Sequence, residues 1–154
     1  MSDGIGPQFI RVVIDAVLSL LTDYTPAILA ELNQTPFTRF GRAFRGQAMA
    51  APEVWAEPVN TTLDDEGQSR HQIHQVKVTV GLVGGDPEAL TDLALDYVRA
   101  VDLAIAQNEK TFDAPVLRIF VREHNYGALR VKGTGFAVFP EVFLLVETEE
   151  DANG

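Results

Sequence analysis

The stretch Gln72–Asn108 reads QIHQVKVTVGLVGGDPEALTDLALDYVRAVDLAIAQN and combines two different hydrophobic periods. Up to Val83, apolar and polar residues alternate, which is typical of a strand with one buried face. From Pro87 onward, apolar residues recur every three or four positions, as on an amphipathic helix. Between the two, Asp86 can cap the helix and Pro87 fits its first position. The stretch therefore predicts a strand followed by one long central helix.

Patterns on either side of this stretch complete the predicted fold. Residues 7–21 have helical spacing, and Thr25-Pro26 is a start signal for a second, short helix. Strand patterns occupy three further ranges: 53–60, 116–123 and 136–148. Proline cannot donate to a strand ladder, so we expect irregularities at Pro58 and Pro140. This order predicts an α+β fold, an antiparallel sheet of about four strands with an N-terminal helix and the central helix packed on it.

The chain of 154 residues is expected to form a single domain spanning 1–154. Two segments lack a clear period, and we expect them to be extended loops: 33–52 and 60–70. The acidic residues 149–154 are expected to form a frayed tail.

The net charge of −10 is unevenly distributed. Residues 1–50 contain four acids and four bases, so the whole excess lies in residues 51–154. Such a chain is unsuited to gripping nucleic acid or an anionic membrane over a broad surface. The absence of cysteine excludes disulfides, a thiolate nucleophile and cysteine-ligated metal. We expect no secretory signal, because the N-terminus lacks a basic region, and no membrane span, because the apolar run Phe9–Leu21 is too short.

Motifs for catalysis, cofactors or metals are weak. No serine lies in a G-x-S-x-G elbow, and the glycine-rich turn before Asp86 lacks the Lys and Ser/Thr of a phosphate loop. His71 and His74 are three residues apart on a strand, so they should point to opposite faces and form no metal pair. A ligand-binding domain or enzyme would require His71, His74 and His124 to converge. We therefore expect no enzyme activity, no cofactor and no metal.

Two surface candidates remain. Arginine and phenylalanine alternate in an otherwise acidic chain over Phe37–Arg45, here called the Arg–Phe segment. This composition is typical of protein interfaces, although fold-internal packing and single-stranded nucleic acid binding also fit it. We favour a subunit or partner interface made by Phe37, Arg39, Phe40, Arg42, Phe44 and Arg45. The second candidate is the acidic loop, in which Asp64, Asp65 and Glu66 are expected to face a lumen or a neighbouring molecule.

The succession of elements resembles the tail terminator proteins of long-tailed bacteriophages and their relatives among minor tail and head–tail joining proteins. The resemblance spans most of residues 7–148. It is carried by four stretches: the strand His74–Gly81, the turn Gly85–Glu88, the helix through Tyr97–Ala104, and the closing strand within Gly135–Glu147. The Arg–Phe segment has no matching part, so its role is not implied by the resemblance.

The resemblance implies a structural protein of the virion tail or neck, assembled in the host cytoplasm. Such proteins form a ring, usually a hexamer, that caps the tail tube and joins it to the head connector. The implied partners are copies of the chain itself, the tail tube protein and a stopper or adaptor protein of the connector. DNA would pass through the lumen without tight binding, in keeping with the acidic charge. The alternatives are a neck or head–tail joining protein of another connector layer, or a small α+β ligand-binding domain or enzyme.

Overall fold

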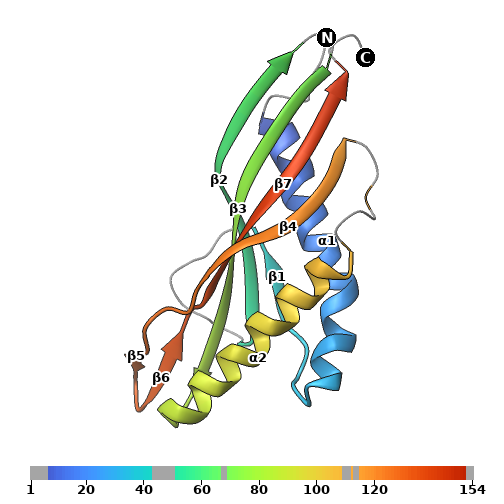
Figure 1. The fold of residues 1–154 in the computed structure, drawn as a ribbon. Helices are drawn as coiled ribbons and strands as arrows, with labels where there is room; N and C mark the ends of the chain where they lie inside the picture. The colour runs from blue at the N-terminus through green and yellow to red at the C-terminus, as the bar shows by residue number, and fades with distance from the viewer. Residues whose placement is uncertain (1–6, 43–50, 67–68, 109–111, 113–114, 152–154) are drawn as a thin grey trace.

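A computed structural model describes residues 7–42, 51–66, 69–108, 112 and 115–151. Two helices pack on a strongly twisted sheet, and the longest strands run from one end of the molecule to the other (Figure 1). Within the described residues the elements are α1 (Pro7–Glu31), β1 (Arg39–Gly41), β2 (Glu53–Glu66), β3 (Ser69–Gly84), α2 (Pro87–Ala106), β4 (Val116–Asn125), β5 (Arg130–Lys132), β6 (Gly135–Val138) and β7 (Glu141–Asp151).

The sheet is built around β3. On one side β3 pairs with β2, whose first three residues also pair in parallel with β1. On the other side β3 pairs first with β7 and then with β6. At the change of partner, the carbonyl of Pro140 accepts a hydrogen bond from the Val80 amide (2.9 Å). The strands β4 and β5 lie outside β7 and β6, respectively.

The α+β class is confirmed, whereas the number of about four strands is too low. The irregularities expected at the two prolines are both present, as a register shift between Pro58 and Asn60 and as the break between β6 and β7. The parallel pairing of β1 was not foreseen, because its three residues show no period of their own.

Two predicted irregular segments are strands instead. The expected loop 60–70 consists of strand residues in its described part, because β2 pairs with β3 in register from Asn60 opposite Gln75 to Glu66 opposite Ser69. Its residues 67 and 68 lie outside the described part. The expected frayed tail 149–154 is part of β7 as far as Asp151, opposite Ser69 in the register, and its residues 152–154 lie outside the described part. Both segments were expected to be irregular because they are polar. Backbone hydrogen bonds to β3 can form a strand ladder even where apolar and polar residues do not alternate. The expected loop 33–52 contains β1, and its residues 43–50 lie outside the described part.

The N-terminal helix is longer than predicted. Thr25 was expected to cap a second helix, but α1 continues through Pro26 to Glu31. The buried Thr25 hydroxyl donates to the carbonyl of Leu21 four residues earlier (2.6 Å). Leu21 and Leu29 are both fully buried in the same core, so tertiary packing outweighs the cost of proline within the helix.

The length of α1 also removes the reason for expecting no membrane span, which was that the apolar run Phe9–Leu21 is too short. The 22 residues Ile10–Glu31 are long and apolar enough to cross a membrane, with a mean hydropathy of 1.6. The core helix of a soluble protein can meet the same criterion. Val13, Val17 and Leu21 of this helix are at most 1% exposed, in a core shared with α2 and the sheet. We therefore interpret α1 as a core helix.

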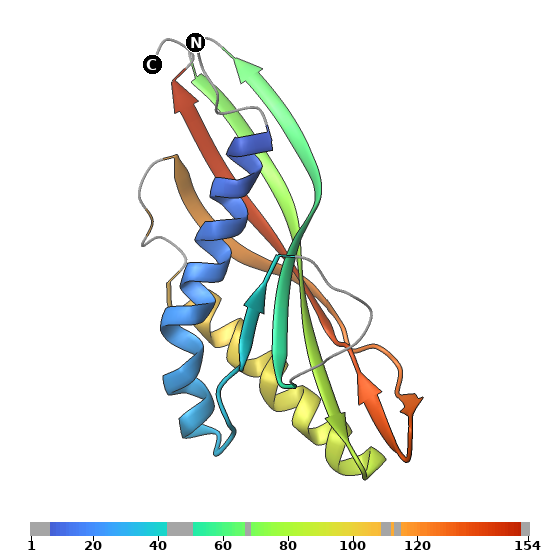
Figure 2. The same cartoon turned by 180° about the vertical axis from the view of Figure 1, so that it is seen from behind.

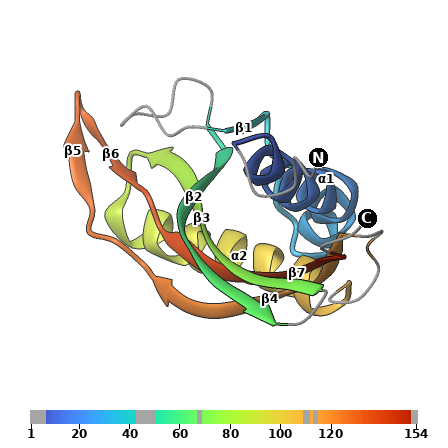
Figure 3. The ribbon, with the colours of Figure 1, turned by 90° about the horizontal axis from the view of Figure 1, so that it is seen from above.

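The helix α2 agrees with the prediction. Asp86 caps it by accepting a hydrogen bond from the Ala89 amide (2.8 Å), and Pro87 occupies its first turn. Its buried stripe packs on α1 and on the sheet. Seen from above, the two helices lie together on one side of the curved sheet, whereas β5 and β6 extend away from α1 (Figure 3). We call the side of the sheet that faces the helices the helix face, and the other side the open face.

Candidate assembly surfaces

The Arg–Phe segment is attached to the body of the protein in its described part. Phe37 is 6% exposed, and its ring lies 5.2 Å from that of Tyr97 on α2 and 5.8 Å from that of Phe40. Arg42 forms an ion pair with Asp15 of α1, with both side chains about half exposed. Phe37 is therefore a core residue, which corrects its inclusion among the interface candidates.

Contacts from α2 position the residues before this segment. Burial raises the pKa of the Tyr97 phenol, which donates to the carbonyl of Thr35 (2.6 Å). Gln34 donates to the carboxylate of Asp96 (2.9 Å). Of the six interface candidates, Phe40 is half-buried against the core, Arg39 is exposed, and Phe44 and Arg45 lie outside the described residues. The described part of the segment thus has a structural role, with Arg39 and Arg42 left at the surface.

The three histidines do not converge. His74 is 2% exposed on the helix face, with its ring nitrogens 2.9 Å from Thr61 Oγ1 and 3.0 Å from Thr148 Oγ1. Burial lowers the pKa of His74 to about 4, so this side chain is neutral at pH 7. His71 lies on the open face, and His124 contacts Asp102 of α2 (2.8 Å). No group of three or more His, Asp or Glu residues in the described ranges could hold a metal ion.

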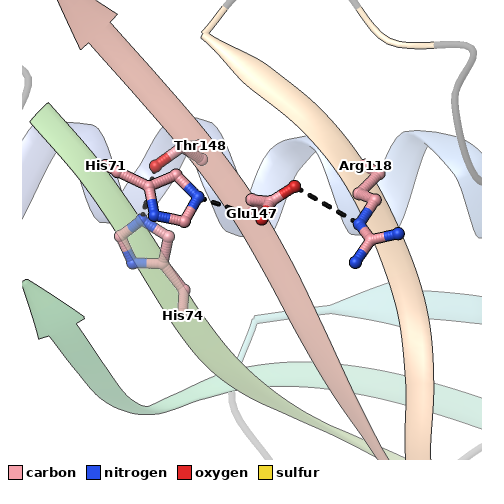
Figure 4. Close-up of polar contacts among 5 residues, drawn as sticks. All are labelled: His71, His74, Arg118, Glu147 and Thr148. Carbon is pink, nitrogen blue, oxygen red and sulfur yellow. Dashed lines mark hydrogen bonds and ion pairs between the residues drawn. The ribbon is translucent and has the colours of Figure 1, made fainter. Parts of the chain in front are cut away.

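His71 belongs to a charged network on the open face. The Glu147 carboxylate accepts from Nε2 of His71 (2.9 Å) and pairs with Nε of Arg118 (3.3 Å), which joins three strands (Figure 4). The guanidinium of Arg118 also lies 4.5 Å from the centre of the Phe120 ring. Farther along β3, Lys77 pairs with Glu57 and Glu141.

The open face mixes these charges with apolar side chains. In the strand register, Phe120 on β4 lies opposite Leu145 on β7, and Leu145 lies opposite Gln75 on β3. Leu145 and Phe120 are half-buried, not sealed under a helix. A surface that combines aromatic, aliphatic and arginine side chains with ion pairs has the composition of a protein interface.

The hairpin β5–β6, here called the hairpin arm, is a surface that sequence reasoning missed. It extends from the end of the molecule opposite the start of α1 and the end of β7 (Figure 2). Val131 is 80% exposed, and Leu129 and Tyr126 beside the arm are 38% and 48% exposed. No strand is predicted between the patterns 116–123 and 136–148, although the alternation in Leu129–Lys132 followed by Gly133 is a usable hairpin signal.

Two glycines fix the arm in its position. Gly133 has φ +59° in the turn, a conformation that other residues rarely adopt. At Gly135, a Cβ would lie 2.9 Å from the carbonyl oxygen of Gly84 on β3. The guanidinium of Arg130 packs back over the Phe139 ring at 5.4 Å. These contacts give the arm a defined conformation as an extension of the sheet and hold its base against β3.

The acidic residues Asp64, Asp65 and Glu66 lie in β2, not in a loop. In the register they are opposite His71, Arg70 and Ser69 of β3. They form the end of β2 that is far from the hairpin arm (Figure 1).

No protein-family model matches the chain, and no curated protein sequence matches it. Solved structures do show its fold. A chain from a structure described as the virion of a native gene transfer agent particle is similar, with a TM-score of 0.60 and 12% identity. The alignment covers 88% of this chain and 93% of that chain. At this identity the likeness shows a shared fold over nearly the whole of both chains.

Proposed function

We propose that this chain is a structural protein of a virion, and that it acts as a tail terminator. In this role, copies of the chain form a closed ring on the end of the tail tube, usually a hexamer in the tail terminators that the chain resembles. The ring stops tube growth and joins the tail to the stopper or adaptor protein of the head connector. The role is structural, with no enzyme activity and no cofactor.

The observation that carries the proposal is the fold shared with a chain of a virion particle. Because the alignment covers 88% and 93% of the two chains, the likeness extends over most of both chains and is not limited to one common motif. It agrees with the resemblance to tail terminators noted from the order of elements. The three separated histidines also favour a structural role over a histidine-based ligand site.

Charge supports the same function. A ring around a DNA channel must let a polyanion pass, and a chain with net charge −10 would not retain it. The virion tail or neck is the corresponding location, with assembly in the host cytoplasm before incorporation.

The test is assembly of the purified chain, alone and with the tail tube protein of the same virion. We expect closed rings in native mass spectrometry and in negative-stain images, with one ring on one end of each tube. A chain that stays monomeric in both mixtures would contradict the proposal. Rings that ignore tubes but bind the connector protein would instead assign the chain to a neck or head–tail joining layer.

A further inference from the structure

Among the strand edges left unpaired within the described residues, two combine a regular register with an exposed large apolar residue. One is the outer edge of β5, which pairs only with β6. The other is the outer edge of β2 beyond Trp55, where its pairing with β1 ends. An unpaired edge presents backbone N–H and C=O groups that can bind a strand of another chain, and proteins usually protect such edges with proline, bulges or charge.

The edge of β5 lacks two of these protections, proline and a bulge, and its charges are all of one sign. Its three residues pair with β6 without a register shift, and none is proline. Val131 in its centre is the most exposed of the large apolar residues in the described chain. Arg130 and Lys132 on either side of it are exposed and basic, in a chain whose net charge is −10. The strand is therefore suited to an acidic partner.

The outer half of β2 has the complementary properties. From Asn60 to Glu66 it pairs with β3 without a register shift, so its other edge is a regular strand edge. Leu63 is 56% exposed, and the next three residues are acidic. The remaining long edge, on β4, has two register shifts, which makes it a poorer template for pairing.

We propose that β5 of one copy of this chain pairs with the outer edge of β2, residues 61–66, in a second copy. A basic strand with an exposed valine would then lie on an acidic strand with an exposed leucine. This is strand addition, in which backbone hydrogen bonds supply affinity and the side chains supply specificity. The inference rests on the proposed ring and identifies the contact between its subunits.

The positions of the two edges allow this contact to repeat. The hairpin arm and the acidic end of β2 lie at opposite ends of the molecule (Figures 1 and 2). A contact between two different surfaces leaves one of each free on every dimer, so further copies can add until the assembly closes. Because the two edges lie at opposite ends, β5 and the outer half of β2 in one chain cannot pair with each other in this fold.

Site-specific cross-linking tests the pairing directly, because the chain contains no cysteine. We would introduce Val131→Cys and Leu63→Cys together, at two exposed positions. The reagent is a bis-maleimide that spans about 5 to 8 Å, the distance between the Cβ atoms of direct and diagonal cross-strand neighbours. We expect a ladder of cross-linked multimers from the double variant, whereas each single variant gives dimers at most.

A charge reversal tests the chemistry of the contact. Lys132→Glu should raise the protein concentration needed for half-assembly about tenfold, because it places like charges together. Adding Asp65→Lys to the same chain should restore assembly. Arg99→Glu on the exposed side of α2 is the matched control with the same change of charge, and it should have little effect. Thermal melting of each variant separates loss of assembly from loss of folding.

The outcomes separate this inference from the proposed function. Rings that assemble normally but give no ladder with the double cysteine variant would overturn the strand pairing and leave the ring function intact. An equal effect of Arg99→Glu and Lys132→Glu would also overturn it, since net charge would then be the cause. Ladders without closed rings would support the pairing and contradict the proposed function.

Discussion

The two faces of the central sheet use the same strands in different ways. On β7, the side chains of Val142, Leu144, Val146 and Thr148 are fully buried on the helix face. The three residues that alternate with them are half-exposed on the open face: Phe143, Leu145 and Glu147. On β3, His74 is buried between two threonines, whereas His71, three residues away, pairs with a carboxylate on the opposite face.

This difference shows that burial, and not residue type, decides what a side chain contributes. On the helix face, a leucine loses contact with water and fills the core, and a histidine loses its solvation. On the open face, the same residue types keep contact with solvent or charged neighbours. Substitutions matched across the two faces can therefore test the comparison.

The largest expected effect comes from adjacent leucines on opposite faces. Leu144→Ala should lower the free energy of unfolding by about 2 to 5 kcal/mol, because it leaves a cavity in the core. Leu145→Ala should cost about 1 kcal/mol, since its half-exposed site can relax and admit water. Urea unfolding of the two variants measures both values. Equal losses would show that the open face is packed as tightly as the helix face.

The second effect concerns pH and His74. Its pKa is about 4 in the folded chain, against about 6.5 when unfolded, so the unfolded chain binds the proton first as the pH falls. Stability should therefore decrease from about pH 6.5 downward and lose up to about 3 kcal/mol by pH 4 from this group.

The comparison of wild type with His74→Gln isolates this contribution from the titration of the many carboxylates. Urea unfolding at pH 7 and at pH 5 should show a smaller decrease for the variant. Leu144→Ala, which alters the same core without removing a titrating group, should keep the slope of the wild type. An unchanged slope in His74→Gln would show that the histidine is more accessible to water than the structure indicates.

A smaller effect is expected for the charged network of the open face. Glu147→Gln removes the pairing with His71 and Arg118, whose side chains are 30% and 45% exposed. Partly exposed ion pairs contribute about 0 to 1 kcal/mol, and salt weakens them. The loss of stability in Glu147→Gln should shrink at high salt in thermal melts. A large loss that salt does not change would indicate an effect on packing.

The smallest effect on folding is expected at Arg42. Its ion pair with Asp15 is about half exposed, so Arg42→Ala should change stability by less than about 1 kcal/mol. If the surface part of the Arg–Phe segment contacts a partner, the same variant should weaken ring or tube binding more than folding. Phe40→Ala is a less selective test, because Phe40 packs against Phe37 and the core. Unchanged assembly of Arg42→Ala would remove Arg42 from the interface candidates.

Elements with a clear period of their own were predicted well. The strand and helix on either side of Asp86 follow from alternation, helical spacing and one capping residue, all of which act within a few positions. The separation of His71 from His74 follows from strand geometry alone. In contrast, the end of the β2–β3 hairpin and the parallel β1 depend on partner strands, which a single segment cannot reveal.

The candidate surfaces divide in the same way. Composition drew attention to the Arg–Phe segment and to the acidic residues from Asp64 to Glu66. It could not show that Phe37 packs on Tyr97, a contact across 60 positions of the chain. It also could not show that the acidic residues form a strand edge. The hairpin arm was missed because its three-residue strands are too short for periodicity to separate them from turns.

The sequence by itself determined the α+β class, the central helix, the interruption at Pro140 and the excess of negative charge. These features depend on the spacing and composition of residues, which can be determined from each segment of the sequence without knowing its partners. Only the tertiary structure decided that α1 continues through Pro26, that Phe37 is in the core, and that two edges of opposite charge lie at opposite ends of the sheet. The physical reason is that packing and strand pairing obtain their free energy from residues distant in the chain, and this can outweigh the local preference of a proline or a polar run.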